Sequence, residues 1–131
     1  MSQDPRKNME VLRHFLDTMN ENDTIRTMKE LGEILTEDYV LHDPSLPDLK
    51  PGRAAFLEFF EQSLKENANH RVTVDDMFGL EDKVVTRGIY EYTDLKVNEH
   101  RKMMMIVISR FEDGKLAEEW GVFAPIAAPS T

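Results

Sequence analysis

Apolar residues in the first 35 positions recur at intervals of three and four, as they do on one face of a helix. Asp4-Pro5 opens this region and is typical of a helix start, because proline fits the first helical position. The polar stretch 20–24 divides the pattern, which therefore predicts two helices. Their apolar faces comprise Met9, Leu12, Phe15, Leu16 and Met19, and then Ile25, Met28, Leu31, Ile34 and Leu35. Inside the second helix, Gly32 costs about 1 kcal/mol relative to alanine, which favours close packing there.

A short strand and a third helix are expected next. Residues 36–43, TEDYVLHD, are too few for a helix and are typical of a strand. Residues 44–52 contain prolines at positions 44, 47 and 51 and form a predicted loop. The helix that follows has an inner side made of Phe56, Phe59, Phe60, Ser63 and Leu64.

From His70 onward the apolar positions alternate, which predicts four consecutive strands. One face of the first strand carries Val72, Val74 and Phe78, and one face of the second carries Val84, Thr86, Tyr90 and Tyr92. The third is apolar on both faces over residues 103–108, as a central strand covered on both sides would be. Asp113-Gly114 predicts a tight turn into the last strand. On that strand Glu119 and Phe123 share one face, while Glu118, Trp120 and Val122 share the other.

This order of elements predicts an α+β fold, in which a curved antiparallel sheet wraps over three helices. Residues 1–131 are expected to form a single domain. Three helices can cover only one face of the sheet, and a strongly curved sheet would leave a cavity above them. The other face must be solvated or buried by a partner. The two apolar faces of residues 103–108 favour a partner, so a homodimer is predicted.

Composition excludes several classes of site. The chain has no cysteine, which rules out a disulfide framework, a thiolate nucleophile and a cysteine-based zinc site. The net charge of −9 repels phosphate backbones and anionic membrane surfaces, so neither nucleic acid nor membrane is an expected partner. No histidine pair has the spacing of a metal site, so no bound metal is expected. The N-terminus lacks the apolar core of a signal peptide, and the expected setting is the cytoplasm.

The stretch YVLHDPSLP, residues 39–47, places a titratable pair where the short strand meets the loop. Histidine has an ordinary pKa of about 6.5, so His42 can give and take a proton near neutrality. Asp43 cannot share a strand face with His42, because neighbouring side chains alternate. If the chain turns at Pro44, Asp43 can cap the loop through its own backbone instead. Both residues are therefore candidates for a site, and a structural loop is the alternative.

Two segments carry a resemblance to a known family. Residues 39–60, YVLHDPSLPDLKPGRAAFLEFF, and 109–126, SRFEDGKLAEEWGVFAPI, resemble the SnoaL-like polyketide cyclase group of the nuclear transport factor 2-like superfamily. The resemblance implies a cone-shaped frame with a pocket between the inner sheet face, the helices and the loop after the first strand. It also implies a carboxylate as general acid/base, often helped by a histidine, with no metal or organic cofactor. His42 occupies the family's histidine position, and Asp43 its asparagine or aspartate position.

The chain departs from the family pattern at three positions. Glu119 stands where the family usually has histidine, and Gly121 where it has an acidic residue. Val107 stands where related members often carry aspartate. Glycine cannot move a proton, so either the acid has migrated, with Glu119 the nearest candidate, or the protein does not carry out that chemistry. A solvated strand edge is the alternative placement for Glu119.

The leading hypothesis is an enzyme that binds a small, mostly apolar carbonyl or polycyclic compound and catalyses cyclisation, isomerisation, dehydration or hydrolysis. His42 would be the base or hydrogen-bond donor, and Glu119 or Asp43 the acid. Tyr90 and Tyr92 could each offer a phenol to a ligand carbonyl or simply pack in the core. The other expected ligand contacts are Phe123, Phe60 and Met105. The alternatives are a ligand-binding protein without catalysis and a dimerisation module whose cavity is packed shut.

Overall fold

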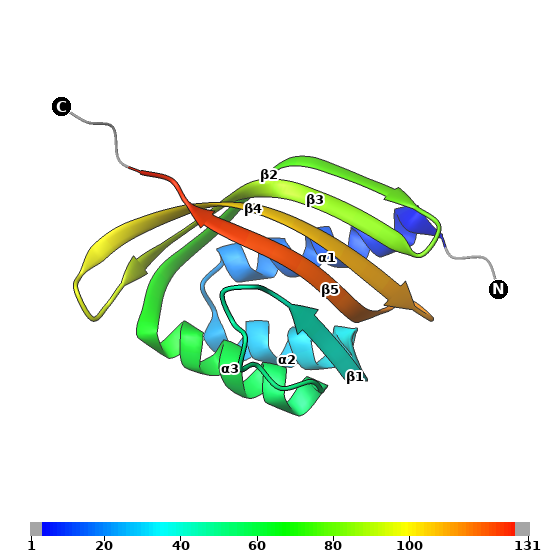
Figure 1. Ribbon diagram of the computed structural model, residues 1–131, viewed down its shortest axis with the longest axis horizontal. Coiled ribbons are helices and arrows are strands. Elements are labelled where there is room, and N and C mark those ends of the chain that lie inside the picture. Colours follow the sequence, from blue (N-terminus) through cyan, green and yellow to red (C-terminus); the bar gives the residue numbers. More distant parts are fainter. Residues whose placement is uncertain (1–3, 128–131) are drawn as a thin grey trace.

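The computed structural model describes residues 4–127 as two layers, a curved sheet arched over three helices (Figure 1). The helices are α1 (Pro5–Asn20), α2 (Thr24–Ile34) and α3 (Arg53–Glu66). The strands are β1 (Leu35–His42), β2 (Asn67–Leu80), β3 (Lys83–Asp94), β4 (Glu99–Glu112) and β5 (Lys115–Pro125). This is the element order that the apolar pattern predicts, and the α+β fold is confirmed.

The sheet is mixed rather than wholly antiparallel, which the pattern did not predict. Its strand order is β1-β5-β4-β3-β2, and β1 runs parallel to β5 while all other neighbours are antiparallel. A parallel pair needs a long connection, and here α3 and three strands lie between β1 and β5. The pairing sets Leu41 opposite Glu119 and His42 opposite Trp120. It therefore decides which face of the sheet each candidate site residue occupies.

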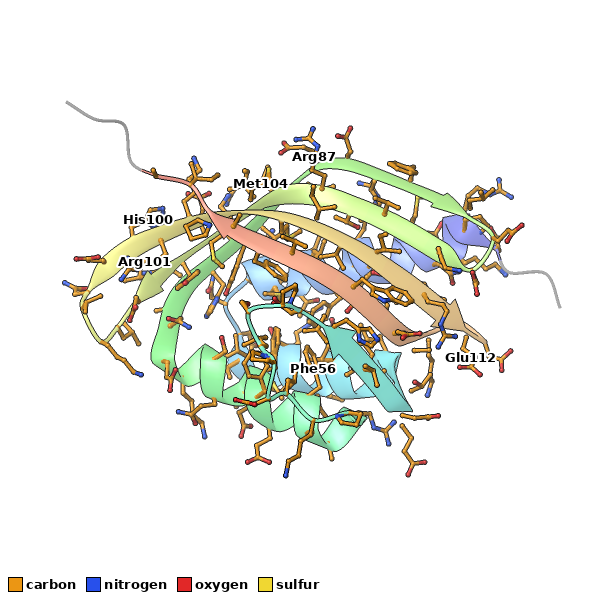
Figure 2. The ribbon with its side chains drawn as sticks, viewed as in Figure 1. Phe56, Arg87, His100, Arg101, Met104 and Glu112 are labelled. Carbon is orange, nitrogen blue, oxygen red and sulfur yellow. The ribbon has the colours of Figure 1, made fainter. Side chains whose placement is uncertain are left out.

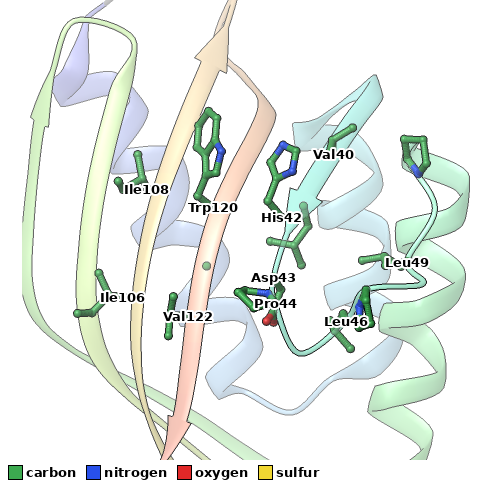
Figure 3. Close-up of a pocket in the computed structure, with 14 residues that line it drawn as sticks. Val40, His42, Asp43, Pro44, Leu46, Leu49, Ile106, Ile108, Trp120 and Val122 are labelled. Atoms are coloured by element: carbon green, nitrogen blue, oxygen red, sulfur yellow. The ribbon is translucent and has the colours of Figure 1, made fainter.

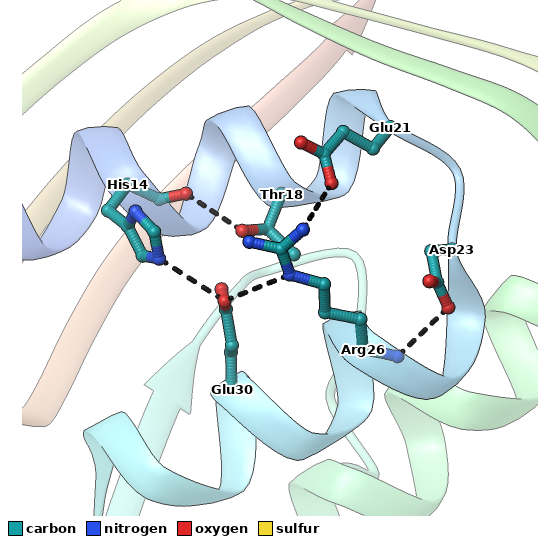
Figure 4. A network of polar contacts seen from close by, with 6 residues as sticks. All are labelled: His14, Thr18, Glu21, Asp23, Arg26 and Glu30. Atoms are coloured by element: carbon teal, nitrogen blue, oxygen red, sulfur yellow. Dashed lines mark hydrogen bonds and ion pairs between the residues drawn. The ribbon is translucent and has the colours of Figure 1, made fainter.

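The first helix begins at Pro5, as Asp4-Pro5 predicts, and the second begins at Thr24, the last residue of the polar stretch. The carboxylates of Asp4 and Asp23 each accept a hydrogen bond from a backbone N–H in the first turn of α1 and α2. Polar contacts also join the two helices away from the sheet (Figure 4). One oxygen of Glu30 lies 3.2 Å from His14 Nε2 and 3.4 Å from Arg26 Nε. Among residues 4–127, no helix has the length and apolar character needed to cross a bilayer.

A bulge in β2 reverses which of its alternating side chains point toward the helices. Along the β2–β3 ladder, β2 advances from residue 74 to 76 while β3 moves only from 88 to 87, so Asp75 is an extra residue. Beyond the bulge, Met77 packs against the core and Phe78 is 60% exposed. The prediction that Phe78 shares a face with Val72 and Val74 is therefore wrong, because strict alternation does not survive an inserted residue.

The two faces of the sheet differ sharply in burial. All three helices lie beneath the inner face, and Phe56 points from α3 toward it (Figure 2). The outer face carries the outer patch, a group of apolar side chains on β4 and β5 that are between 38% and 56% exposed: Met104, Ile106, Ile108, Trp120 and Val122. Apolar residues on both faces of β4, as the sequence predicts, are thus confirmed.

Candidate functional site

A cavity of about 410 Å³, here called the inner cavity, lies between the helices and the inner face of the sheet. Apolar side chains from α1, α3, β4 and β5 form most of its wall, among them Phe15, Phe60, Met105, Val107 and Phe123. Its volume exceeds the roughly 300 Å³ at the low end of ligand pockets. The space between helices and sheet is therefore not packed shut.

Glu119 points from β5 into the inner cavity and is held by two hydroxyl groups. Tyr39 Oη donates to Glu119 Oε1 at 2.7 Å, and Ser109 Oγ donates to Oε2 at 2.5 Å. Tyr39 comes from the parallel edge strand β1, and Ser109 is the direct cross-strand neighbour of Glu119 on β4. The carboxyl group is thus fixed from both adjacent strands.

Burial raises the pKa of Glu119 above the usual glutamate value, and the hydrogen bonds from Ser109 and Tyr39 offset this only in part. Burial, with the nearby charge of Glu119, also raises the pKa of Tyr39. The Tyr39 hydroxyl therefore stays protonated and donates a hydrogen bond to Glu119. A carboxylate has about four acceptor positions, and these two bonds use two of them. The carboxyl group can therefore still exchange a proton with a molecule in the cavity.

His42 lies on the opposite face of the sheet from Glu119. It lines a second, open groove of about 740 Å³, the outer groove, between the loop after β1 and the outer sheet face (Figure 3). Its Nε2 is 2.6 Å from Glu118 Oε2, and its ring stacks on Trp120 with centroids 5.5 Å apart. The His42 bond, followed by Arg110, lowers the pKa of Glu118. The expectation that His42 and Glu119 line one pocket is wrong, because β1 pairs His42 with Trp120 and Leu41 with Glu119.

Asp43 occupies the boundary between the two hollows and lines both. Its Oδ1 accepts hydrogen bonds from the backbone N–H of Ser45 at 2.9 Å and from the Ser45 hydroxyl at 2.8 Å. This is the loop cap that the sequence analysis gave as one of two alternatives. Asp43 therefore lines the inner cavity with one carboxylate oxygen already engaged by the turn.

Comparison with known proteins identifies the family to which this fold belongs. A family model described as a SnoaL-like domain matches residues 12–119. The chain belongs to the SnoaL-like domain family. Curated proteins give no match to the chain.

Solved structures share the fold of this SnoaL-like domain at low sequence identity. TsrD from Streptomyces laurentii is 21% identical with a TM-score of 0.75, over 92% of this chain and 90% of the other. IdmH from Streptomyces antibioticus, named as a candidate polyketide cyclase, is 22% identical with a TM-score of 0.72, over 88% and 91%. A candidate ketosteroid isomerase from Kribbella flavida is 19% identical with a TM-score of 0.70, over 98% and 85%.

The position that is acidic in the family pattern faces the inner cavity but carries no side chain. A Cβ at Gly121 would lie 3.1 Å from Phe123, 3.7 Å from Val107 and 3.8 Å from Leu41, all of which line the inner cavity. Glu119 and Asp43 are therefore the two carboxyl groups among the described residues that line the cavity of this SnoaL-like domain.

The five residues expected to contact a ligand, Phe60, Tyr90, Tyr92, Met105 and Phe123, all line the inner cavity. Their role as ligand contacts remains a prediction. Three residues that hold the polar groups of the site were not predicted from the sequence: Tyr39, Ser109 and His70. Counting back across the Asp113-Gly114 turn would set Ser109 opposite Glu118. A register shift between Phe111 and Arg110 moves the pairing by one residue and brings Ser109 opposite Glu119 instead. Tyr39 and His70 join the site through long-range pairings that no local pattern encodes.

Proposed function

We propose that this SnoaL-like domain binds a small, mostly apolar molecule in the inner cavity and moves a proton on it through Glu119, with no metal or organic cofactor. The observation that carries the proposal is a single glutamate, raised in pKa by burial, among apolar walls. Cyclisation, isomerisation, dehydration and hydrolysis all use such a group. The structural neighbours named as a cyclase and an isomerase support the same class.

The proposed roles differ from the initial hypothesis in the partner of the acid. Because His42 lies in the outer groove, Tyr39 and Ser109 assist Glu119 in its place. They orient the Glu119 carboxyl group and stabilise its negative charge when it gives up a proton. Asp43, which also lines the cavity, is the second candidate acid. His42 acts on the inner site only through the strand that it shares with Tyr39.

Ring opening of nitrobenzisoxazole tests the proposal without knowledge of the natural substrate. A base removes the ring C–H proton while the N–O bond breaks, which yields a coloured phenolate from an apolar molecule small enough for the cavity. The carboxylate of Glu119 is the active form, so the rate should rise with pH through its pKa. Because burial raises that pKa, the rise should lie at higher pH than for acetate in solution.

The outcomes separate the two candidate functions. Turnover above the acetate background with the shifted profile supports catalysis. Saturable binding without such turnover would contradict catalysis and favour a ligand-binding protein, for which the bare position at Gly121 is the motivating observation. Absence of binding by nitrobenzisoxazole and by other small aromatic probes would contradict both.

We further propose that the outer patch holds two copies of the chain together. It is an exposed apolar surface on a chain of net charge −9. Four of its members, Ile106, Ile108, Trp120 and Val122, also line the outer groove, so a second copy seated there would border His42.

Ile106→Arg is expected to convert a dimer into a monomer, because it places a charge in the buried centre of the interface. Light scattering at micromolar concentration should give twice the chain mass for the wild type and one chain mass for the variant. Ile25→Arg is the matched control, since Ile25 is 84% exposed on α2, away from the patch. A monomeric wild type, or an unchanged mass for Ile106→Arg, would contradict the proposed dimer.

A further inference from the structure

His70 and Tyr90 form a second polar pair beside the inner cavity. His70 is 5% exposed, and its Nδ1 lies 2.7 Å from the hydroxyl oxygen of Tyr90, which lines the cavity. The other ring nitrogen, Nε2, lies 3.1 Å from the backbone carbonyl oxygen of Asn67. The planes of the two rings are nearly parallel, with an interplanar angle of 9° and centroids 6.0 Å apart. Both nitrogens of the imidazole are thus engaged.

These contacts fix where the protons are. A carbonyl oxygen only accepts hydrogen bonds, so Nε2 of His70 must carry a hydrogen. In the neutral ring Nδ1 is then bare, and Tyr90 Oη–H must donate to it. Burial lowers the pKa of His70 and favours this neutral form, against a smaller opposing effect of the Asn67 carbonyl.

The backbone of His70 is held as well. Its N–H donates to Asn22 Oδ1 at 2.7 Å, and its carbonyl oxygen accepts from Asn22 Nδ2 at 3.1 Å. This clamp attaches the edge strand β2 to the turn between α1 and α2. The backbone that carries the imidazole is therefore fixed, while the contacts of its two ring nitrogens hold the ring toward Tyr90.

We infer that Tyr90 faces the cavity as a hydrogen-bond acceptor, because its only proton is committed to His70, and that this point selects ligands carrying a hydroxyl or N–H group. The inference rests on the proposed function and refines its ligand. It differs from both alternatives that the sequence left open for Tyr90, which were a phenol donating to a ligand carbonyl and a side chain packed in the core. Tyr92 has no such constraint from His70, since both ring nitrogens are already taken.

Tyr90 and Glu119 are separate polar points along the cavity. Ser109 on β4 pairs with Glu119 on β5 and with Val84 on β3, so Glu119 lies level with Val84. Tyr90 is six residues further along β3 than Val84. At about 3.3 Å per residue this is roughly 20 Å of strand. A hydroxyl or N–H group bound at Tyr90 is therefore distinct from the atom on which Glu119 would act.

Binding of naphthol and of its methyl ether, methoxynaphthalene, tests the inference. The two probes share an apolar body, but only naphthol has a proton to donate. Wild type should bind naphthol roughly threefold to tenfold more tightly, the value of one hydrogen bond. Tyr90→Phe should remove this preference, and Tyr92→Phe, the matched control, should keep it. His70→Leu frees the Tyr90 proton and should strengthen binding of the ether.

Nitrogen NMR of His70 gives a reading that needs no ligand. A bare Nδ1 and a protonated Nε2 support the inference, and a protonated Nδ1 at neutral pH overturns it. Equal affinities of the two probes for wild type, or a preference that survives in Tyr90→Phe and is lost in Tyr92→Phe, also overturn it while the ligand pocket stands. Failure of both probes to bind overturns the proposed pocket itself, and the ligand selection with it.

Discussion

Glu119→Gln is expected to lower the turnover of nitrobenzisoxazole by roughly one hundred to ten thousand fold, the usual contribution of a positioned acid or base. Glutamine has nearly the shape of glutamate, and its amide oxygen can still accept the hydrogen bond from Tyr39. It cannot take up a proton. The substitution therefore removes the chemistry and keeps the cavity, so binding of the probe should change little.

Glu118→Gln is the matched control for this result. Glu118 is the preceding residue on β5, but its side chain lies on the outer face beside His42 and Arg110. Turnover should be unaffected. If Glu118→Gln or His42→Ala lowers the rate as much as Glu119→Gln, the chemistry lies in the outer groove. If Glu119→Gln retains full turnover, Glu119 is not the base that removes the proton, and Asp43→Asn becomes the next variant to measure.

Loss of the fold should not confuse the comparison. A carboxyl group whose pKa is raised by burial binds its proton more tightly in the folded state, so the stability it provides is lost as pH rises through that pKa. Above the usual glutamate pKa, Glu119 is therefore a cost to the folded state rather than a support, because the unfolded chain loses its proton more readily. Glu119→Gln should be at least as stable as the wild type in denaturant unfolding at neutral pH, with the difference vanishing in acid.

The sequence predicted the elements better than the site, for a physical reason. Periodicity reports local geometry, and it correctly assigned Glu119 and Glu118 to opposite faces because β5 pairs regularly with β4 from Glu118 onward. In β1 the pairing register shifts between Leu35 and Val40, so alternation could not decide whether His42 or Leu41 faces the helices. The family motif identified His42 as a candidate, but it did not indicate which face of the sheet the His42 side chain occupies.

Long-range contacts account for the rest of what was missed. The bond between Tyr39 and Glu119 spans 80 positions, and that between His70 and Tyr90 joins two strands at a bulged edge. Such contacts depend on strand order and bulges, which a single sequence does not display. The polar residues that define the cavity were for this reason harder to predict than its apolar wall.

Gly88→Ala is expected to destabilise the fold by about 3 kcal/mol or more, at the upper end of overpacking substitutions. Gly88 faces the bulge in β2, where a Cβ would lie 2.2 Å from the carbonyl oxygen of Thr73 and 3.2 Å from the Val74 Cα. These are backbone atoms that no side-chain rotation can move aside. The β2–β3 ladder would have to separate at the point where the edge of the sheet bends.

Gly32→Ala is the matched control, because it adds the same methyl group to the same protein. Its Cβ would meet only Leu57 Cδ1 at 3.9 Å, an ordinary van der Waals contact. The close packing expected at Gly32 from sequence is therefore wrong. Alanine here should instead stabilise α2 by up to about 1 kcal/mol through helix propensity. Chemical denaturation of both variants measures the two effects. Similar stabilities for Gly88→Ala and the wild type would mean that the bulge can move, so the curvature of the sheet above the cavity is not fixed by Gly88.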